Sequence, residues 1–313
     1  MTPEPTLREA MPEDGPAVDA FLASVFGVAR PPGTWSWLYR ATPAGPGCSV
    51  IAEVQGRIVA HAGGLRRALR VGRRVEPCVQ SIDAATADGW RHQGLNSRLR
   101  ALLQRLVGPA SVYGFSNPAS TPGVLARQGR VALGPLPLLA RPLPLARQVH
   151  GPAPVAPPSD VTGLLSHDLG WVAVQSDLAT LRWRYGRPGA AYGVAEVRGA
   201  GRLLAWGVFA VRRVRRLPVA LIMDALAPPH LLGQLHEAML HSAARYGCRA
   251  AAALAFRGTP GRRSLARAGF FPVPAWANPE PMTLSVGRWG AACPALVKDP
   301  RSWSLSFADH DVP

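Results

Sequence analysis

A turn between two predicted elements holds residue types that suit a phosphate-binding site. Val79–Ala87 carries few charges and predicts a buried strand, and the segment from Leu95 predicts a helix because leucines recur at positions 95, 99, 102, 103 and 106. The turn runs from Arg91 to Ser97 and contains Gly94. The first N–H groups of a helix lack partners and lie at the positive end of its dipole. An arginine and a glycine at that place indicate a pyrophosphate cradle.

The elements around this turn are expected to include an antiparallel meander of strands with helices before and after it. Glycines at the tight turns and the spacing of apolar residues set the expected bounds. The expected order is a strand from Thr6, a helix capped near Asp14, strands Cys48–Val54 and Arg57–Leu65 joined at Gln55-Gly56, a further pair around Gly72, the strand, turn and helix above, strand Ala110–Phe115 and helix Ser120–Gln128.

A proline-rich segment, Gly134–Pro158, divides the chain. Proline lacks an N–H and has a fixed φ, so this segment is expected to contain neither a regular helix nor a central strand, and to act as a linker. The predicted organisation is a domain over residues 1–139, a linker over 140–160 and a second domain over 161–313.

The second half of the sequence repeats landmarks of the first half in the same order, which predicts a tandem duplication. The second copy lacks the cradle, because Ala227–Gly233 holds no arginine where the first copy has Arg91–Ser97. The matches are Trp37 with Trp183, Ala52–Val54 with Ala195–Val197, Asp83-Ala84 with Asp224-Ala225, Thr121–Gly123 with Thr259–Gly261, and Leu125–Gly129 with Leu265–Gly269.

At Arg91 and Gly94 the sequence resembles the GNAT superfamily of acyl-CoA-dependent N-acyltransferases, whose cofactor loop reads Arg/Gln-x-x-Gly-x-Gly/Ala. Asn96 departs from that pattern. The whole chain is similar to a bacterial group of tandem GNAT proteins, with Leu181–Tyr185 and Tyr113–Asn117 among the residues that carry the likeness. The resemblance implies an α/β fold with mixed sheets, made of two tandem GNAT-like domains of which the second is degenerate.

The resemblance also implies which residues hold the cofactor, acetyl-CoA or another acyl-CoA. Backbone groups of the central strand would bind the pantetheine arm and the thioester carbonyl, and the turn with the helix start would bind the pyrophosphate. The implied residues are Ala85, Thr86, Ala87, Arg91, His92, Gln93, Gly94, Leu95, Asn96 and Ser97.

Candidate catalytic residues follow from the same resemblance. Asp83 is the carboxylate nearest the expected cleft, and Ser116 and Asn117 follow the strand after the cradle helix. Asp224 repeats Asp83 in the copy without a cradle, so a structural role in both copies is an alternative. Many relatives place a tyrosine on the next helix as general acid, and none lies between Asn117 and Arg130.

The leading hypothesis for function is an enzyme that moves an acyl group, expected to be acetyl, from acyl-CoA to a primary amine of a small molecule such as an amino sugar. In that reaction the amine attacks the thioester directly. One alternative is an aminoacyl-tRNA-dependent transferase, which leaves tRNA open as a partner. The other is a non-catalytic protein that binds acyl-CoA.

Composition restricts the class of protein. The net charge of +16 comes almost entirely from arginine, Lys298 being the one lysine, and the arginines are spread along the chain. No apolar run approaches a membrane span, and the start of the sequence is polar, so a cytoplasmic protein is expected. Four scattered cysteines form no CxxC or Cys/His pattern, so neither zinc nor another metal site is indicated.

Overall fold

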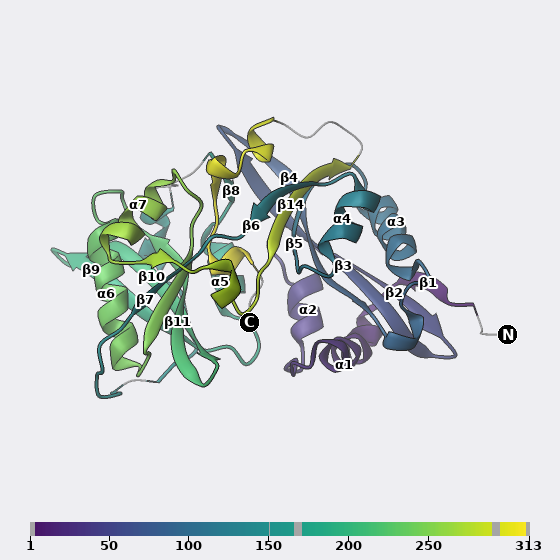
Figure 1. Ribbon diagram of the computed structural model, residues 1–313, viewed down its shortest axis with the longest axis horizontal. Coiled ribbons are helices and arrows are strands. Elements are labelled where there is room, and N and C mark those ends of the chain that lie inside the picture. The colour runs from purple at the N-terminus through teal and green to yellow at the C-terminus, as the bar shows by residue number, and fades with distance from the viewer. Residues whose placement is uncertain (1–3, 150, 166–170, 290–294, 311–313) are drawn as a thin grey trace.

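Two mixed β-sheets make up the molecule, and helices cover each of them (Figure 1). The computed structural model describes residues 4–149, 151–165, 171–289 and 295–310. Within this part of the chain, one sheet has nine strands and the other has six. The mixed α/β architecture with two successive units agrees with the fold class expected from the sequence.

The first sheet has the order β1-β2-β3-β4-β5-β14-β6, with β8 joining β3 and β15 joining β8. The elements expected from the sequence of the first half are present, including both hairpins. Their bounds are β1 (Thr6–Glu9), α1 (Gly15–Phe26), α2 (Thr34–Tyr39), β2 (Cys48–Val54), β3 (Arg57–Val71), β4 (Arg74–Thr86), α3 (Leu95–Val107), β5 (Ala110–Ser116), α4 (Thr121–Gln128) and β6 (Val131–Pro135).

The second sheet has the order β13-β7-β12-β11-β10-β9. Its strands and helices follow the same sequence of types as β2 to α4, which is the repeat predicted from the landmarks. The remaining elements of the chain, of which β8, β14 and β15 belong to the first sheet, are β7 (Leu138–Pro142), β8 (Val172–Val174), α5 (Leu178–Tyr185), β9 (Tyr192–Gly199), β10 (Arg202–Val214), β11 (Leu217–Leu226), α6 (Leu232–Arg245), β12 (Ala250–Leu254), α7 (Pro260–Arg267), β13 (Phe271–Pro272), β14 (Thr283–Trp289) and β15 (Trp303–Ser304).

The two halves exchange strands. β7 follows the first half in sequence but lies between β12 and β13 of the second sheet. β14, near the end of the chain, lies between β5 and β6 of the first sheet (Figure 1). The expectation that Gly134–Pro158 holds no central strand is therefore wrong. The prolines lie at the ends of β7, since Pro137 directly precedes the strand and Pro142 is its last residue. The N–H groups that pair with β12 therefore come from residues other than proline.

The exchange bears on the predicted domain boundaries, which stay a prediction. A cut after residue 139 would pass through β7 and leave Leu138 and Leu139 without the strand to which they belong. Leu139 is fully buried among apolar residues of the second sheet and α6. The second sheet is thus completed by a strand at the start of the predicted linker, and the first sheet by strands that follow the linker.

Two tryptophans at matching places of the repeat contact each other. The rings of Trp37, on α2, and Trp183, on α5, stack with centroids 4.8 Å apart and planes 13° apart. Each indole also donates a hydrogen bond to the main-chain oxygen of the other residue, Trp37 Nε1 at 2.7 Å and Trp183 Nε1 at 2.9 Å. The pair is reciprocal, so the two copies are related locally by an approximate twofold axis.

We expect this pair to couple the stabilities of the two halves. Replacing Trp37 or Trp183 by alanine ends the stacking contact and removes one of the two hydrogen bonds, and the second substitution removes the other hydrogen bond but no further stacking. A double-mutant cycle in denaturant should give a coupling free energy of about 1 kcal/mol. Additive effects of the two substitutions would contradict an energetic role for the contact.

The largest apolar core is shared by both halves. It contains Tyr113 and Leu284 of the first sheet, Trp206 and Leu254 of the second, and Trp303 near the end of the chain. Separate clusters lie under α3 and under α1 and α2. Because successive residues of a strand face opposite sides, Val50 packs in the α3 cluster and Ile51 in the α1 and α2 cluster, so these helices cover opposite faces of the first sheet.

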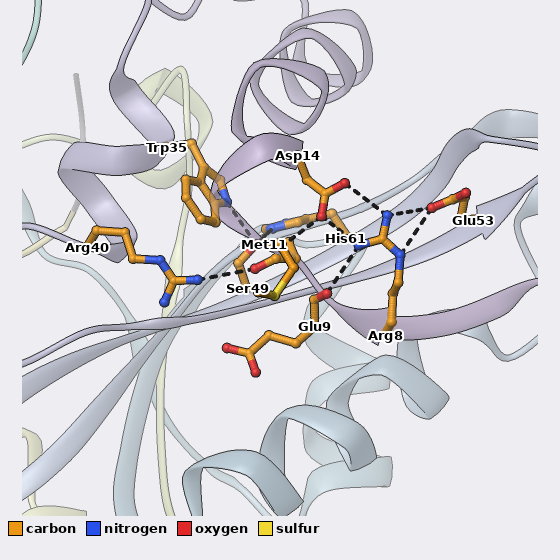
Figure 2. Close-up of polar contacts among 10 residues, drawn as sticks. Arg8, Glu9, Met11, Asp14, Trp35, Arg40, Ser49, Glu53 and His61 are labelled. Carbon is orange, nitrogen blue, oxygen red and sulfur yellow. Dashed lines mark hydrogen bonds and ion pairs between the residues drawn. The ribbon is translucent and has the colours of Figure 1, made fainter.

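Arg8 connects the first strand to the first long helix. Its guanidinium lies 2.6 Å from Asp14, at the start of α1, and 2.6 Å from Glu53 on β2 (Figure 2). Hydrogen bonds to these carboxylates raise the pKa of Arg8, chiefly the bond to Asp14. The bridge fixes the position of α1 against the sheet.

Candidate functional site

A cleft opens in the first sheet where the parallel strands β4 and β5 part. The two strands are paired from Cys78 with Ser111 as far as Ser81 with Gly114. Beyond that pair they diverge around a cleft of about 370 Å³, lined by both strands and by residues of α3 and α4. The closed end of the cleft is therefore at Ser81 and Gly114, and the mouth lies toward the turn before α3.

A β-bulge shapes the wall of this cleft on β4. Pairing with β3 shifts register between His61 and Gly63, so Asp83 and Ala84 stand out of the ladder, and Asp83 has a φ of 51°. A residue other than glycine with a positive φ is strained, and such strain persists only where surrounding groups hold it. The bulge is held both by its main chain and by its side chain.

His61 holds the main chain of the bulge through a buried line of hydrogen bonds. Its Nδ1 lies 2.7 Å from the carbonyl oxygen of Asp83, and its Nε2 lies 2.8 Å from Ser49 Oγ, which also accepts a hydrogen bond from Trp35 Nε1. Figure 2 shows Trp35, Ser49 and His61 together. A carbonyl can only accept, so the proton is on Nδ1, and Ser49 donates to Nε2.

His61 is a positioning residue in this arrangement. Its side chain is fully buried, and burial lowers its pKa, so the ring is neutral. Both ring nitrogens are used within the fold, which leaves neither free to take a proton from a substrate.

Arg30 and Tyr39 hold the side chain of the bulge. Arg30 donates to both carboxylate oxygens of Asp83 at 3.1 Å, and the Tyr39 hydroxyl donates to Oδ2 at 3.0 Å. Arg30 also pairs with Asp19, and its carboxylate neighbours raise its pKa despite burial, so it remains charged. Asp83 lines the cleft, but its oxygens are used by these partners, which favours a positioning role over that of a base.

The turn before α3 has the form of a helix start with free donors. Gly94 is the N-cap with a φ of 75°, and α3 begins at Leu95. The first N–H groups of the helix thus face outward from the turn. Arg91 is exposed and pairs with Asp88 at 2.7 Å, while Asn96 and Ser97 line the mouth of the cleft.

Ser116 and Asn117 lie where β5 ends at the cleft. Ser116 is buried and its Oγ is 2.7 Å from Thr121 Oγ1. The Asn117 side-chain oxygen accepts from the N–H and the hydroxyl of Ser120, both at 2.9 Å, so it supports the start of α4. Both residues line the cleft.

The structure brings some of the predicted site residues together and leaves others at the rim. Five line the cleft: Asp83, Asn96, Ser97, Ser116 and Asn117. The remaining candidates belong to the end of β4 and the turn after it and are not part of the cleft lining. They are Ala85, Thr86, Ala87, Arg91, His92, Gln93, Gly94 and Leu95.

Three arginines of the cleft were not expected from the sequence. Arg100 on α3, Arg127 on α4 and Arg130 after α4 all line it. Within the described residues, none of the three forms an ion pair with a carboxylate. The sequence signal was present for Arg100, because it lies next to the buried leucines 95, 99 and 103 rather than on the outer face of α3.

The fold of this chain is similar to that of solved structures, although its sequence matches no known family. No family model and no curated protein matches the sequence. Solved structures match at low identity: yeast N-myristoyltransferase with bound myristoyl-CoA (TM-score 0.62, 10% identity, 91% of this chain and 83% of that one) and a GCN5-related N-acetyltransferase from Anabaena variabilis (0.62, 10%, 90% and 72%). A conserved Enterococcus faecalis V583 protein described as a probable N-acyltransferase also matches (0.63, 8%, 92% and 73%). The chain has the tandem GNAT fold.

The second GNAT-like copy keeps a cleft but not the cradle. Its parallel strands β11 and β12 are paired from Val219 to Leu221 and then part around a cleft of about 430 Å³. Pro228 and Pro229 precede α6 where the first copy has the arginine and glycine turn. Asp224 receives hydrogen bonds from Arg184 and Tyr185, as Asp83 does from Arg30 and Tyr39.

An acidic residue near the end of the chain connects the two halves. Asp309 is buried between the halves, where it pairs with Arg184 at 3.3 Å and its main-chain oxygen accepts from Gln80. Burial raises the pKa of Asp309. Asp311 lies outside the described residues.

A buried histidine in the second cleft predicts an acid-sensitive fold. His236 on α6 bonds to Ser264 at 3.0 Å, and burial lowers its pKa to about 4. The unfolded chain then binds more protons below about pH 6.5, so stability is lost as the pH falls from about 6.5 to about 4, by at most about 3 kcal/mol. A His236→Gln variant should reduce the slope of the unfolding free energy against pH in that window, to which the buried His61 and His310 also contribute, whereas His92→Gln, on the exposed turn, should not. Equal slopes in the parent and His236→Gln would contradict this.

Neither a metal centre nor a membrane-spanning helix is seen in the described parts of the chain. No three His, Cys, Asp or Glu side chains converge there in a way that could hold a metal ion. The described helices are all too short or too polar to cross a bilayer.

Proposed function

We propose that the protein is an acyl-CoA-dependent N-acyltransferase whose β4–β5 cleft holds the thioester. The observation that carries this proposal is the combination, in one copy, of a parted parallel strand pair, a bulge at its edge and an open helix start at its mouth. The solved structures with the same fold include N-acyltransferases, and one of them contains myristoyl-CoA.

The cofactor would lie across these features in order. The pyrophosphate suits the turn Arg91–Ser97, where helix N–H groups and Gly94 allow close approach. The pantetheine arm would follow the end of β4, over Ala85–Ala87, into the cleft. The thioester carbonyl would meet the bulge at Asp83 and Ala84, whose main-chain groups lie outside the ladder with β3.

The reaction then proceeds by direct attack. The amine nitrogen bonds to the thioester carbon, the carbon–sulfur bond breaks, and CoA leaves as the thiolate. One proton leaves the amine and one joins the thiolate. The chain contributes mainly by orientation and by main-chain donors at the developing oxyanion. Asp83 and Ser116 are polar side chains of the cleft lining, and Asp83 acts by holding the bulge.

The acceptor is proposed to be a primary amine of a small molecule, with acetyl-CoA as the first donor to test. The two faces of the first sheet are covered by different helices, one by α3 and the other by α1 and α2. With the cofactor on the α3 side, the amine would approach from the side of α1 and α2.

Calorimetric titration with acetyl-CoA and longer acyl-CoAs, followed by a thiol-release screen of amines, tests the proposal. We expect micromolar binding and amine-dependent release of CoA. Binding without release by any amine would favour a non-catalytic acyl-CoA-binding protein. Folded protein that binds no acyl-CoA would overturn the proposal and make tRNA the next partner to test.

A further inference from the structure

An arginine without a partner is buried at the closed end of the β4–β5 cleft. Arg130 is 6% exposed, and its Nε and Nη2 atoms are buried without any hydrogen bond. Two glycines make room for it, because a Cβ added at Gly114 would lie 2.9 Å from Arg130 Nη1 and one at Gly287 would lie 3.3 Å from its Cγ. The space for this guanidinium is thus built by two neighbouring strands, β5 and β14.

A second arginine lies beside it. Arg100 donates to Ser81 Oγ at 2.6 Å and to Asn96 Oδ1 at 2.8 Å. Burial lowers the pKa of Arg100 to about 10, and burial together with the charge of Arg100 lowers the pKa of Arg130. Both hydrogen bonds of Arg100 are to neutral groups, and the described residues offer neither arginine a carboxylate partner. Buried positive charge without a counterion is costly, so an anion bound here would be strongly favoured.

The position of the two arginines within the cleft indicates which anion they would bind. Arg100 is five residues along α3 from Leu95, so its main chain lies about 7.5 Å along the helix axis from the helix start where the pyrophosphate would bind. Its partner Ser81 belongs to the last pair of β4 and β5, two residues before the bulge. Two strand residues span about 7 Å, so a chain of a few carbons would reach from a thioester at the bulge to the arginines.

We propose that Arg100 and Arg130 bind the free carboxylate of the acyl group, so that the preferred donor is the CoA thioester of a short dicarboxylic acid. This inference rests on the proposed function and specifies the class of acyl-CoA that donates the acyl group. A guanidinium binds a carboxylate or a phosphate with paired N–H bonds, so the shared chemistry is an oxyanion. A phosphate of CoA is the other source, and the experiment separates the two.

The test compares three probes by calorimetry: succinyl-CoA, butyryl-CoA, which has the same chain length without the charge, and CoA itself. We expect succinyl-CoA to bind at least about tenfold more tightly than butyryl-CoA. Arg130→Met should remove that preference and leave the affinities for butyryl-CoA and CoA unchanged. Arg249 also has a buried nitrogen without a hydrogen bond, but it does not line the cleft. The control variant Arg249→Met should therefore leave the preference for succinyl-CoA intact.

A second readout separates binding from a structural role. Because Arg130→Met removes an uncompensated buried charge, the ligand-free variant should melt at the same temperature as the parent or higher. Equal affinities of the parent for succinyl-CoA and butyryl-CoA would overturn the inference while the proposed function stands. Equal weakening of all three probes by Arg130→Met would assign the arginines to a CoA phosphate and overturn it too. Failure of all acyl-CoAs to bind the parent would overturn the proposed function itself.

Discussion

A Gly123→Glu variant is expected to lose at least about tenfold in acyl-CoA affinity, while Gly261→Glu, its counterpart in the repeat, keeps the parent affinity. Gly123 is on α4 and lines the β4–β5 cleft, and Gly261 is on α7 and lines the β11–β12 cleft. A glutamate at residue 123 adds bulk and negative charge where an anionic cofactor would enter.

The two glycines make a matched pair of sites. Neither has a positive φ, and a Cβ added at either meets no heavy atom within 4 Å. Each lies in the first turn of its helix, where glutamate is favoured by the dipole and has a better helix propensity than glycine. Both variants should therefore fold, and calorimetry with acetyl-CoA compares them directly. Loss of affinity in Gly261→Glu alone would move the binding site to the second copy.

An Asp83→Asn variant is expected to lower the free energy of unfolding by about 3 kcal/mol. The substitution leaves Arg30 buried without one of its two carboxylate partners, and the side chains of Arg30 and Asp83 are only 13% and 9% exposed. Breaking a buried ion pair by removing one charge is far more costly than breaking an exposed pair. Denaturant unfolding followed by fluorescence measures the change.

Asp14→Asn serves as the control for this variant. It removes a carboxylate from Arg8, whose side chain is 38% exposed and which retains Glu53, so the loss should stay below about 1 kcal/mol. If Asp83 were the general base instead, Asp83→Asn would fold with the parent's stability and lose turnover with its acyl-CoA affinity intact. That outcome would contradict the positioning role.

The sequence predicted the parts of the fold that depend on local patterns. The leucine spacing of α3, the glycine hairpin at Gln55-Gly56 and the repeat itself were all found in the structure. The expected order of strands and helices in the first half was also found. These features are readable because burial of one helix face and tight-turn conformations leave periodic and residue-specific traces.

The exchange of β7 and β14 could not be predicted from the sequence, because pairing between distant strands has no local signature. The prolines around β7 also argued against a strand there. The repeat matched Trp37 with Trp183 by position, but it did not predict that the two rings stack on each other. Arg130 follows a glycine after a helix, a place typical of exposed residues, and only the tertiary structure shows that it is buried. The sequence therefore singled out five residues that line the cleft, but not the arginines at its closed end.

The central claim is that acyl-CoA binds between β4 and β5 of the first copy. A crystal structure of the protein with a bound acyl-CoA tests it most directly. We predict the pyrophosphate at the turn Arg91–Ser97 and the thioester at Asp83 and Ala84. Density for the cofactor between β11 and β12, or on any surface away from the β4–β5 cleft, would contradict the account.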